Sequence, residues 1–116
     1  MFRSEAQQCQ AIRLLLSSLR LEHLWTAQGP TRRACDLLEG SPLSSGEQIL
    51  IRCAFDFWNG AGKVQLYRDL LGVLDGPRLH LVLTLAMAAN DGERAVDEWI
   101  KRNNKPVLQE PIGPAA

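Results

Sequence analysis

Apolar residues recur at helical spacing along most of the chain. Near the N-terminus, Cys9, Ile12, Leu15, Leu16 and Leu19 follow one another at steps of three, three, one and three residues. This spacing places their side chains on one face of an α-helix. Over the whole chain the same pattern predicts six helical segments, one of them irregular or merged with a neighbour, at residues 5–26, 31–39, 44–58, 66–74, 78–89 and 90–102.

Residues that start and stop helices stand at the boundaries of these segments. Ser44 followed by Glu47 has the form of a capping box, in which each side chain bonds the backbone N–H of the other residue. Asp75 followed by Pro77 supplies a capping residue and an early-helix proline. Ser4 with Gln7, Thr31, and Asn90 with Glu93 are further signals for the start of a helix. Gly29 and Pro30 are expected to end the first helix.

The segment 78–89 differs from the other helices because it is apolar almost all round. Its sequence RLHLVLTLAMAA is interrupted only by Arg78, His80 and Thr84. A helix that is apolar on every side is expected to be contacted by its neighbours on most sides. We therefore predict that this helix lies at the centre of the fold, with His80 partly buried and hydrogen bonded to a neighbouring helix.

Length and composition favour one all-α domain. The chain has 116 residues, the usual size of a single domain. Leucine dominates the apolar residues while β-branched residues are sparse, which favours helix over sheet. We predict a compact bundle of five to six helices over residues 1–102. Prolines at 106, 111 and 114 predict a non-helical, flexible tail over 103–116.

Charge and cysteine content say little about partners but exclude some classes. Thirteen basic and thirteen acidic residues give no net charge that would steer the protein to nucleic acid or to an acidic membrane. Cys9, Cys35 and Cys53 are widely spaced and sit among apolar positions, which predicts free, buried thiols. Neither they nor His23 and His80 form the close ligand pairs of a zinc site. We therefore expect that the protein holds no metal. The chain opens without a secretory signal, so we also expect a cytoplasmic protein.

No motif in the sequence indicates an enzyme. The segment WNGAGK lacks the spacing of a phosphate-binding loop and is better explained as the end of a helix. No serine, cysteine or histidine stands in a known catalytic signature, and no cofactor fingerprint is present. We therefore expect a non-enzymatic protein without a cofactor.

Three aromatic residues are the predicted partner-binding residues: Phe55, Trp58 and Trp25. Phe55 lies about 200° around its helix from Phe57, so both cannot face one core. Either the helix is buried on two sides or Phe55 meets a partner. Tryptophan is also the residue most enriched at the centres of interfaces. This pattern favours a small adaptor, inhibitor or regulatory subunit that binds another protein, or a second copy of itself, through an apolar helical surface.

A DNA-binding regulator is the alternative. Residues 1–33 carry more arginines than acids, and Arg32 and Arg33 stand where a short helix would present phosphate contacts. Arg13 and Arg20 would lie on the preceding helix. The nearby acids Asp36 and Glu39 would repel phosphate, which makes nucleic acid the less favoured partner.

Overall fold

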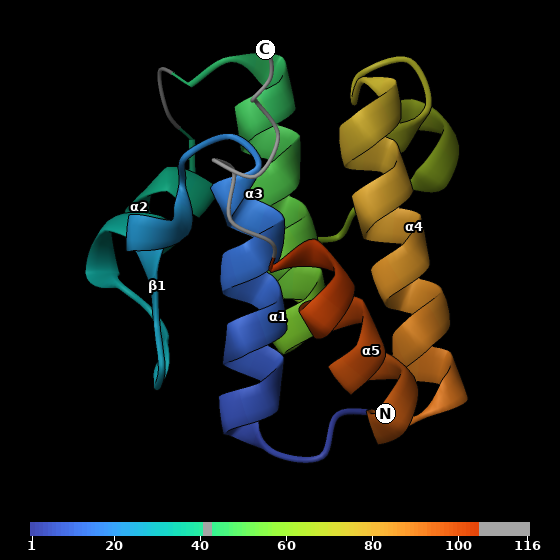
Figure 1. The fold of residues 1–116 in the computed structure, drawn as a ribbon. Helices are drawn as coiled ribbons and strands as arrows, with labels where there is room; N and C mark the ends of the chain where they lie inside the picture. The colour runs from blue at the N-terminus through green and yellow to red at the C-terminus, as the bar shows by residue number, and fades with distance from the viewer. Residues whose placement is uncertain (41–42, 105–116) are drawn as a thin grey trace, which may run out of the picture.

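The computed structural model describes residues 1–40 and 43–104 and is all-α apart from one short hairpin (Figure 1). Its helices and strands are α1 (Glu5–Ser17), η1 (Glu22–Leu24), β1 (Trp25–Thr26), β2 (Gly29–Pro30), α2 (Arg32–Leu38), α3 (Ser45–Trp58), η2 (Leu66–Leu70), α4 (Gly76–Asp91) and α5 (Glu93–Asn103). The prediction of an all-α domain is confirmed.

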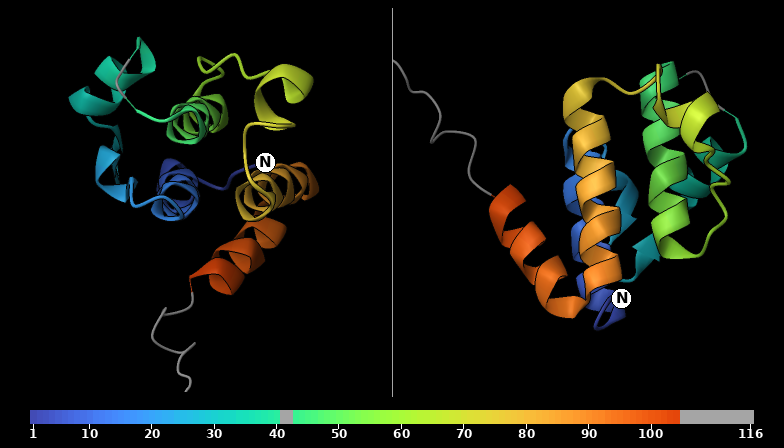
Figure 2. Two further views of the ribbon diagram at one scale, coloured as in Figure 1. Left: turned by 90° about the horizontal axis from the view of Figure 1, so that it is seen from above. Right: turned by 90° about the vertical axis from the view of Figure 1, so that its right-hand side faces the viewer.

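The long helices form two antiparallel pairs. Helices α1 and α3 run in opposite directions side by side, and α4 and α5 form a hairpin that packs on α1 (Figure 1). Helix α2 and the hairpin β1–β2 lie on the far side of the α1–α3 pair from α4 and α5, as the view from above shows (Figure 2). Fully buried side chains between these elements include Ile12, Leu15, Leu16, Leu50, Ile51, Leu85, Val96 and Trp99.

Side-chain caps begin four of the helices at or close to the predicted residues. The capping box of Ser44 and Glu47 is present in both directions, with bonds of 3.3 and 3.0 Å. Asp75 accepts a hydrogen bond from the Arg78 N–H at 3.1 Å, and Thr31 accepts one at the start of α2. These caps are local, so their residues identify them without knowledge of the tertiary fold.

The first helix ends nine residues before the predicted boundary, at Ser17. The Leu21 N–H bonds the Leu16 carbonyl and the Arg20 N–H bonds the Ser17 carbonyl, at 3.0 and 3.1 Å. Arg20 has a φ of +60°, so this is a Schellman ending with arginine where glycine is usual. Leu16 and Leu21, both buried, supply the apolar contact of that motif. The prediction was wrong because no glycine marks the left-handed position.

Gly29 and Pro30 form a strand rather than a helix end. They pair antiparallel with Trp25 and Thr26, Trp25 opposite Pro30 and Thr26 opposite Gly29. The Thr26 hydroxyl donates to the Gly29 carbonyl at 3.0 Å and closes the turn. This hairpin places Trp25 in the core beside α3.

The predicted helix 66–74 is only one π-type turn followed by irregular backbone. The Leu71 N–H bonds the Leu66 carbonyl five residues earlier at 3.0 Å, and Gly72 then adopts a φ of +96°. Leu70 and Leu74 are buried while the side chains between them are exposed. The helix does not continue because these two anchors and the left-handed glycine require a different backbone path.

Helix α4 was predicted to be central, and this is wrong. Only Val82, Leu85, Ala88 and Ala89 of the helix are buried, and Met87 is 66% exposed. His80 is exposed rather than partly buried. Helices α1 and α5 pack on the inner face of α4, and no other described long helix covers its outer face.

The last helix begins without the predicted cap. Helix α4 continues through Asn90 to Asp91, and Gly92, with a φ of +126°, joins it to α5. Val96, Trp99 and Ile100 of α5 are buried. Asn103, assigned to the tail by the sequence, is the last residue of α5, and the rest of the predicted tail beyond Asn104 lies outside the described residues.

Candidate protein-binding surface

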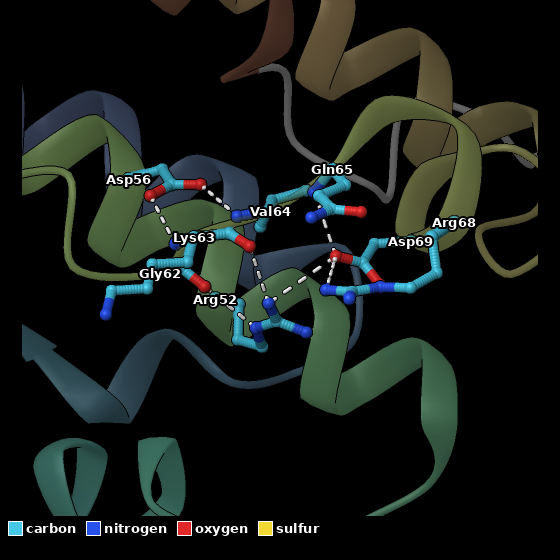
Figure 3. Close-up of polar contacts among 8 residues, drawn as sticks. All are labelled: Arg52, Asp56, Gly62, Lys63, Val64, Gln65, Arg68 and Asp69. Carbon is cyan, nitrogen blue, oxygen red and sulfur yellow. Dashed lines mark hydrogen bonds and ion pairs between the residues drawn. The ribbon is translucent and has the colours of Figure 1, made fainter.

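Two side chains of α3 hold the chain that follows it. Arg52 and Asp56 stand four residues apart, so they lie on the same face of the helix, and both point at the segment from Gly62 to Asp69 (Figure 3). The Asp56 carboxylate accepts hydrogen bonds from the N–H groups of Lys63 and Val64, at 2.8 and 2.9 Å. These bonds fix the loop after α3 against the helix.

The guanidinium of Arg52 also binds the loop that follows α3. Its Nε donates to the Gly62 carbonyl at 2.8 Å and its Nη2 donates to the Lys63 carbonyl at 2.7 Å. The same Nη2 lies 3.4 Å from Oδ2 of Asp69. One guanidinium therefore ties the loop and the π-type turn to α3 (Figure 3).

The loop approaches α3 so closely that only glycine fits at position 62. A Cβ added there would lie 1.8 Å from the Arg52 carbonyl oxygen. Lys63 next to it adopts a φ of +54°, a left-handed conformation that costs free energy for a residue with a side chain. The bonds from Arg52 and Asp56 hold the backbone in this conformation.

Asp69 is the buried acid of this network. It is 5% exposed and accepts hydrogen bonds from the Arg68 guanidinium at 2.9 and 3.0 Å and from the Gln65 N–H at 2.8 Å. These bonds, led by that of Arg68, together with the nearby charge of Arg52, lower the pKa of Asp69 to about 2. The carboxylate thus stays charged and closes the π-type turn at neutral pH.

The anchored segment presents apolar side chains to solvent. Tyr67 is 86% exposed and Leu66 is 56% exposed, and Leu71 and Val73 are also exposed. We call these four residues the 66–73 surface. Single exposed apolar side chains are common in proteins, but four within eight residues of one segment make it a candidate binding site.

A small cleft adjoins this surface. It has a volume of about 270 Å³ and is lined by residues of α3, α4 and the anchored segment, namely Cys53, Asp56, Phe57, Val64, Leu66, Leu70 and Val82. Most of these side chains are apolar. Leu66 belongs to both the cleft and the 66–73 surface, so the cleft adjoins that surface at Leu66.

The three aromatic residues predicted to bind a partner are packed on one another instead. Trp25 is 2% exposed and Phe55 is 4% exposed, and their rings meet edge to face with centroids 5.2 Å apart. Trp58 is half-buried, lies 5.9 Å from Trp25 between ring centroids, and covers Gly29. Helix α3 is therefore buried on two sides, the first of the two alternatives for Phe55, and Phe55 is not exposed to a partner. That Trp58 binds a partner stays a prediction.

The arginines of the nucleic-acid alternative lie on three different elements. Arg13 is on α1, Arg20 is in the turn that follows it, and Arg32 and Arg33 begin α2. All four are exposed. The prediction of a basic binding face stays a prediction, because exposure alone does not distinguish phosphate-binding arginines from solvated ones.

The cysteines are free, but one of them is not buried. Cys9 and Cys53 are buried, whereas Cys35 is exposed on the outer side of α2. Burial raises the pKa of the Cys9 thiol and raises that of Cys53 to about 12. The sequence predicted a buried Cys35 because it sits among apolar positions, but on this short helix only Ala34 and Leu37 are buried.

Comparison of the chain with protein-family models, with curated proteins and with solved structures finds no match. Within residues 1–40 and 43–104, no helix is long and apolar enough to cross a membrane. The same residues contain no group of three or more histidine, cysteine, aspartate or glutamate side chains that could hold a metal ion.

Sequence reasoning missed the 66–73 surface because it treated the segment as a regular helix. One signal was available: Leu70 and Leu74 stand four residues apart on one helical face, which leaves Tyr67, Leu71 and Val73 on other faces. The network of Arg52, Asp56 and Asp69 gave no local signal, since it joins residues up to seventeen positions apart.

Proposed function

We propose that the protein is a non-enzymatic protein-binding module that acts through the 66–73 surface. The observation that carries this proposal is the combination of exposed Leu66, Tyr67, Leu71 and Val73 with the network that anchors their backbone to α3. A binding segment that is ordered beforehand loses less conformational entropy when its partner binds. The partner is another protein or a second copy of this chain, and we place the activity in the cytoplasm, which suits three free thiols.

Serine substitutions test the surface directly. Tyr67→Ser and Leu71→Ser remove exposed apolar side chains and leave the buried anchors Leu70 and Leu74 in place. We expect each to weaken binding by at least tenfold, as measured by capture of a stoichiometric partner from host lysate followed by titration of that purified partner. Met87→Ser on α4 is the matched control, since Met87 is exposed and apolar but lies outside this surface.

Self-association is measured on the same variants by sedimentation equilibrium. A dimer that Leu71→Ser dissociates and Met87→Ser preserves identifies a second copy as the partner. Binding that all three substitutions leave unchanged would overturn the proposal. Nuclease treatment of the captured complex tests the nucleic-acid alternative. A complex that dissociates with nuclease, and that does not form when Arg32→Ala and Arg33→Ala are combined, would show nucleic-acid binding and overturn the proposal.

A further inference from the structure

A hollow of about 270 Å³ lies along the hairpin of α4 and α5 and shares no residue with the 66–73 surface. Small side chains leave this space open, since Ala88 of α4 and Ala95 of α5 both line it. Thr84, another lining residue, accepts a hydrogen bond at 2.9 Å from Nε1 of the fully buried Trp99. This bond ties the two helices together where the hollow lies.

Met87 projects beside the hollow. It is one of the lining residues and is 66% exposed, and Leu83, one turn earlier on the same face of α4, is 39% exposed. Methionine is unbranched and flexible, so it fills irregular apolar spaces well. We call Leu83, Met87 and the lining of the hollow the α4–α5 face. A face that has both a projecting side chain and a hollow next to it can pair with a copy of itself, because a two-fold interface uses the same patch on both chains.

Opposite charges stand at the two ends of the hollow. Asp91 ends α4 beside the connection to α5, whereas Arg102 lies in the last turn of α5, at the open end of the antiparallel hairpin (Figure 1). Both side chains are exposed, and neither forms an ion pair with another described residue. Met87 lies between the two ends. The α4–α5 face therefore offers one acid and one base on either side of its projecting side chain.

We propose that two copies of the chain pair through the α4–α5 face, with their α4 helices antiparallel and Met87 of each copy in the hollow of the other. A two-fold axis perpendicular to α4 near Met87 exchanges the two ends of the hollow. It therefore brings Arg102 of each copy to Asp91 of the other, and two ion pairs form between the chains. Arg102 then lies between this Asp91 and Glu98 of its own chain, one turn earlier on α5. This charge complementarity favours a second copy over an unrelated partner.

The dimer goes beyond the proposed function and does not depend on it. It leaves the 66–73 surface of each copy free, so one dimer presents two such surfaces to another protein. Met87→Ser, the control for partner capture, should weaken the dimer and leave the titration of a captured partner unchanged. Leu71→Ser should do the opposite. Either surface can thus fail its test while the other passes.

Sedimentation equilibrium of the full chain tests the pairing. We expect a monomer–dimer equilibrium, which Met87→Asp should weaken at least tenfold because a carboxylate would enter the alanine-lined hollow. Leu71→Asp is the matched control, since Leu71 is also exposed and apolar but lies on the 66–73 surface, and it should leave the dimer intact. A chain that stays monomeric at millimolar concentration would overturn the proposal. So would a dimer that Met87→Asp preserves or that Leu71→Asp dissociates.

Charge reversal tests the ion pairs. Asp91→Lys would place like charges opposite Arg102, and Arg102→Glu would place them opposite Asp91, so each variant alone should dimerise at least tenfold more weakly. The two variants mixed in equal amounts should form a heterodimer, since each pair across the axis then joins opposite charges. The double variant, whose net charge equals that of the wild type, should recover the homodimer.

Asp36→Lys and Arg33→Glu are the controls for this series. Both residues are exposed on α2, and the substitutions change the net charge by the same amounts outside the α4–α5 face. Each should leave the dimer unchanged. Equal effects of Asp36→Lys and Asp91→Lys would show a general charge effect and overturn the pairing. Failure of both the mixture and the double variant to dimerise would overturn it as well.

Discussion

The ring of Phe55 meets the ring of Trp25 edge to face, at 72° and with centroids 5.2 Å apart. Phe55 comes from the last turn of α3 and Trp25 from the short hairpin, thirty residues earlier. Their contact joins the hairpin to the helical core and explains why Phe55 and Phe57 can lie on different faces of one helix.

This contact predicts a large stability loss for Phe55→Ala. The substitution leaves a cavity beside Trp25, and we expect the free energy of unfolding to fall by about 3 to 5 kcal/mol, measured by urea denaturation followed by tryptophan fluorescence. Tyr67→Ala is the comparison: Tyr67 is 86% exposed, so its removal should change the free energy of unfolding by less than about 0.5 kcal/mol. Equal losses in both variants would contradict the burial of Phe55.

Two glycine substitutions should have opposite effects. In Gly62→Ala the new methyl group would meet the Arg52 carbonyl oxygen at 1.8 Å, so the loop must move away from α3 and the protein loses stability. In Gly46→Ala the new group meets no atom within 4 Å and lies in the first turn of α3, so we expect a gain of about 0.4 to 1 kcal/mol. Thermal unfolding measured by circular dichroism compares the two. A neutral Gly62→Ala would show that the loop does not lie against α3.

The three cysteines should react in a fixed order. Cys35 is exposed, whereas Cys9 and Cys53 are buried and burial raises the pKa of both thiols, that of Cys53 to about 12. The thiolate is the reactive form, so iodoacetamide at pH 8 should alkylate Cys35 first and the other two only after unfolding in urea. Peptide mass spectrometry reads the order, and Cys35→Ser should abolish the fast phase. Rapid labelling of Cys53 in the folded protein would contradict its position in the core.

Acid should destabilise the protein between about pH 4 and pH 2. The guanidinium of Arg3 and the amide of Gln7 lower the pKa of Asp97 to about 2, and Arg68 and the Gln65 N–H do the same for Asp69. The unfolded chain binds protons at these acids at a higher pH than the folded chain does. The stability they contribute is therefore complete above the unfolded pKa and is lost as pH falls through the folded pKa.

The urea midpoint measured from pH 5 to pH 2 checks this expectation. It should fall in the wild type and fall less steeply when Asp69→Asn and Asp97→Asn are combined. Each single variant should lie between these two. A double variant whose midpoint falls as steeply as that of the wild type would show that neither acid is responsible.

Local interactions could be predicted from sequence, and non-local ones could not. The capping box of Ser44 and Glu47 and the cap at Asp75 act within four residues, so the capping residues of α3 and α4 were predicted correctly. The end of α1 was missed because Arg20 occupies the left-handed position, where a glycine usually stands and marks the end of a helix. The candidate surface was missed because an ion pair between Arg52 and Asp69, seventeen residues apart, holds the 66–73 segment against α3.

The sequence by itself determined that this is an all-α domain and where most of its helices lie, because helical periodicity and caps depend on neighbours within one or two turns. The tertiary structure alone decided which apolar residues are inside. Phe55 and Trp25 became core residues because the hairpin folds back on α3, while Tyr67 and Leu71 stayed at the surface because Leu70 and Leu74 occupy the places against the core. Burial depends on contacts between distant segments, and hydropathy along the chain does not carry that information.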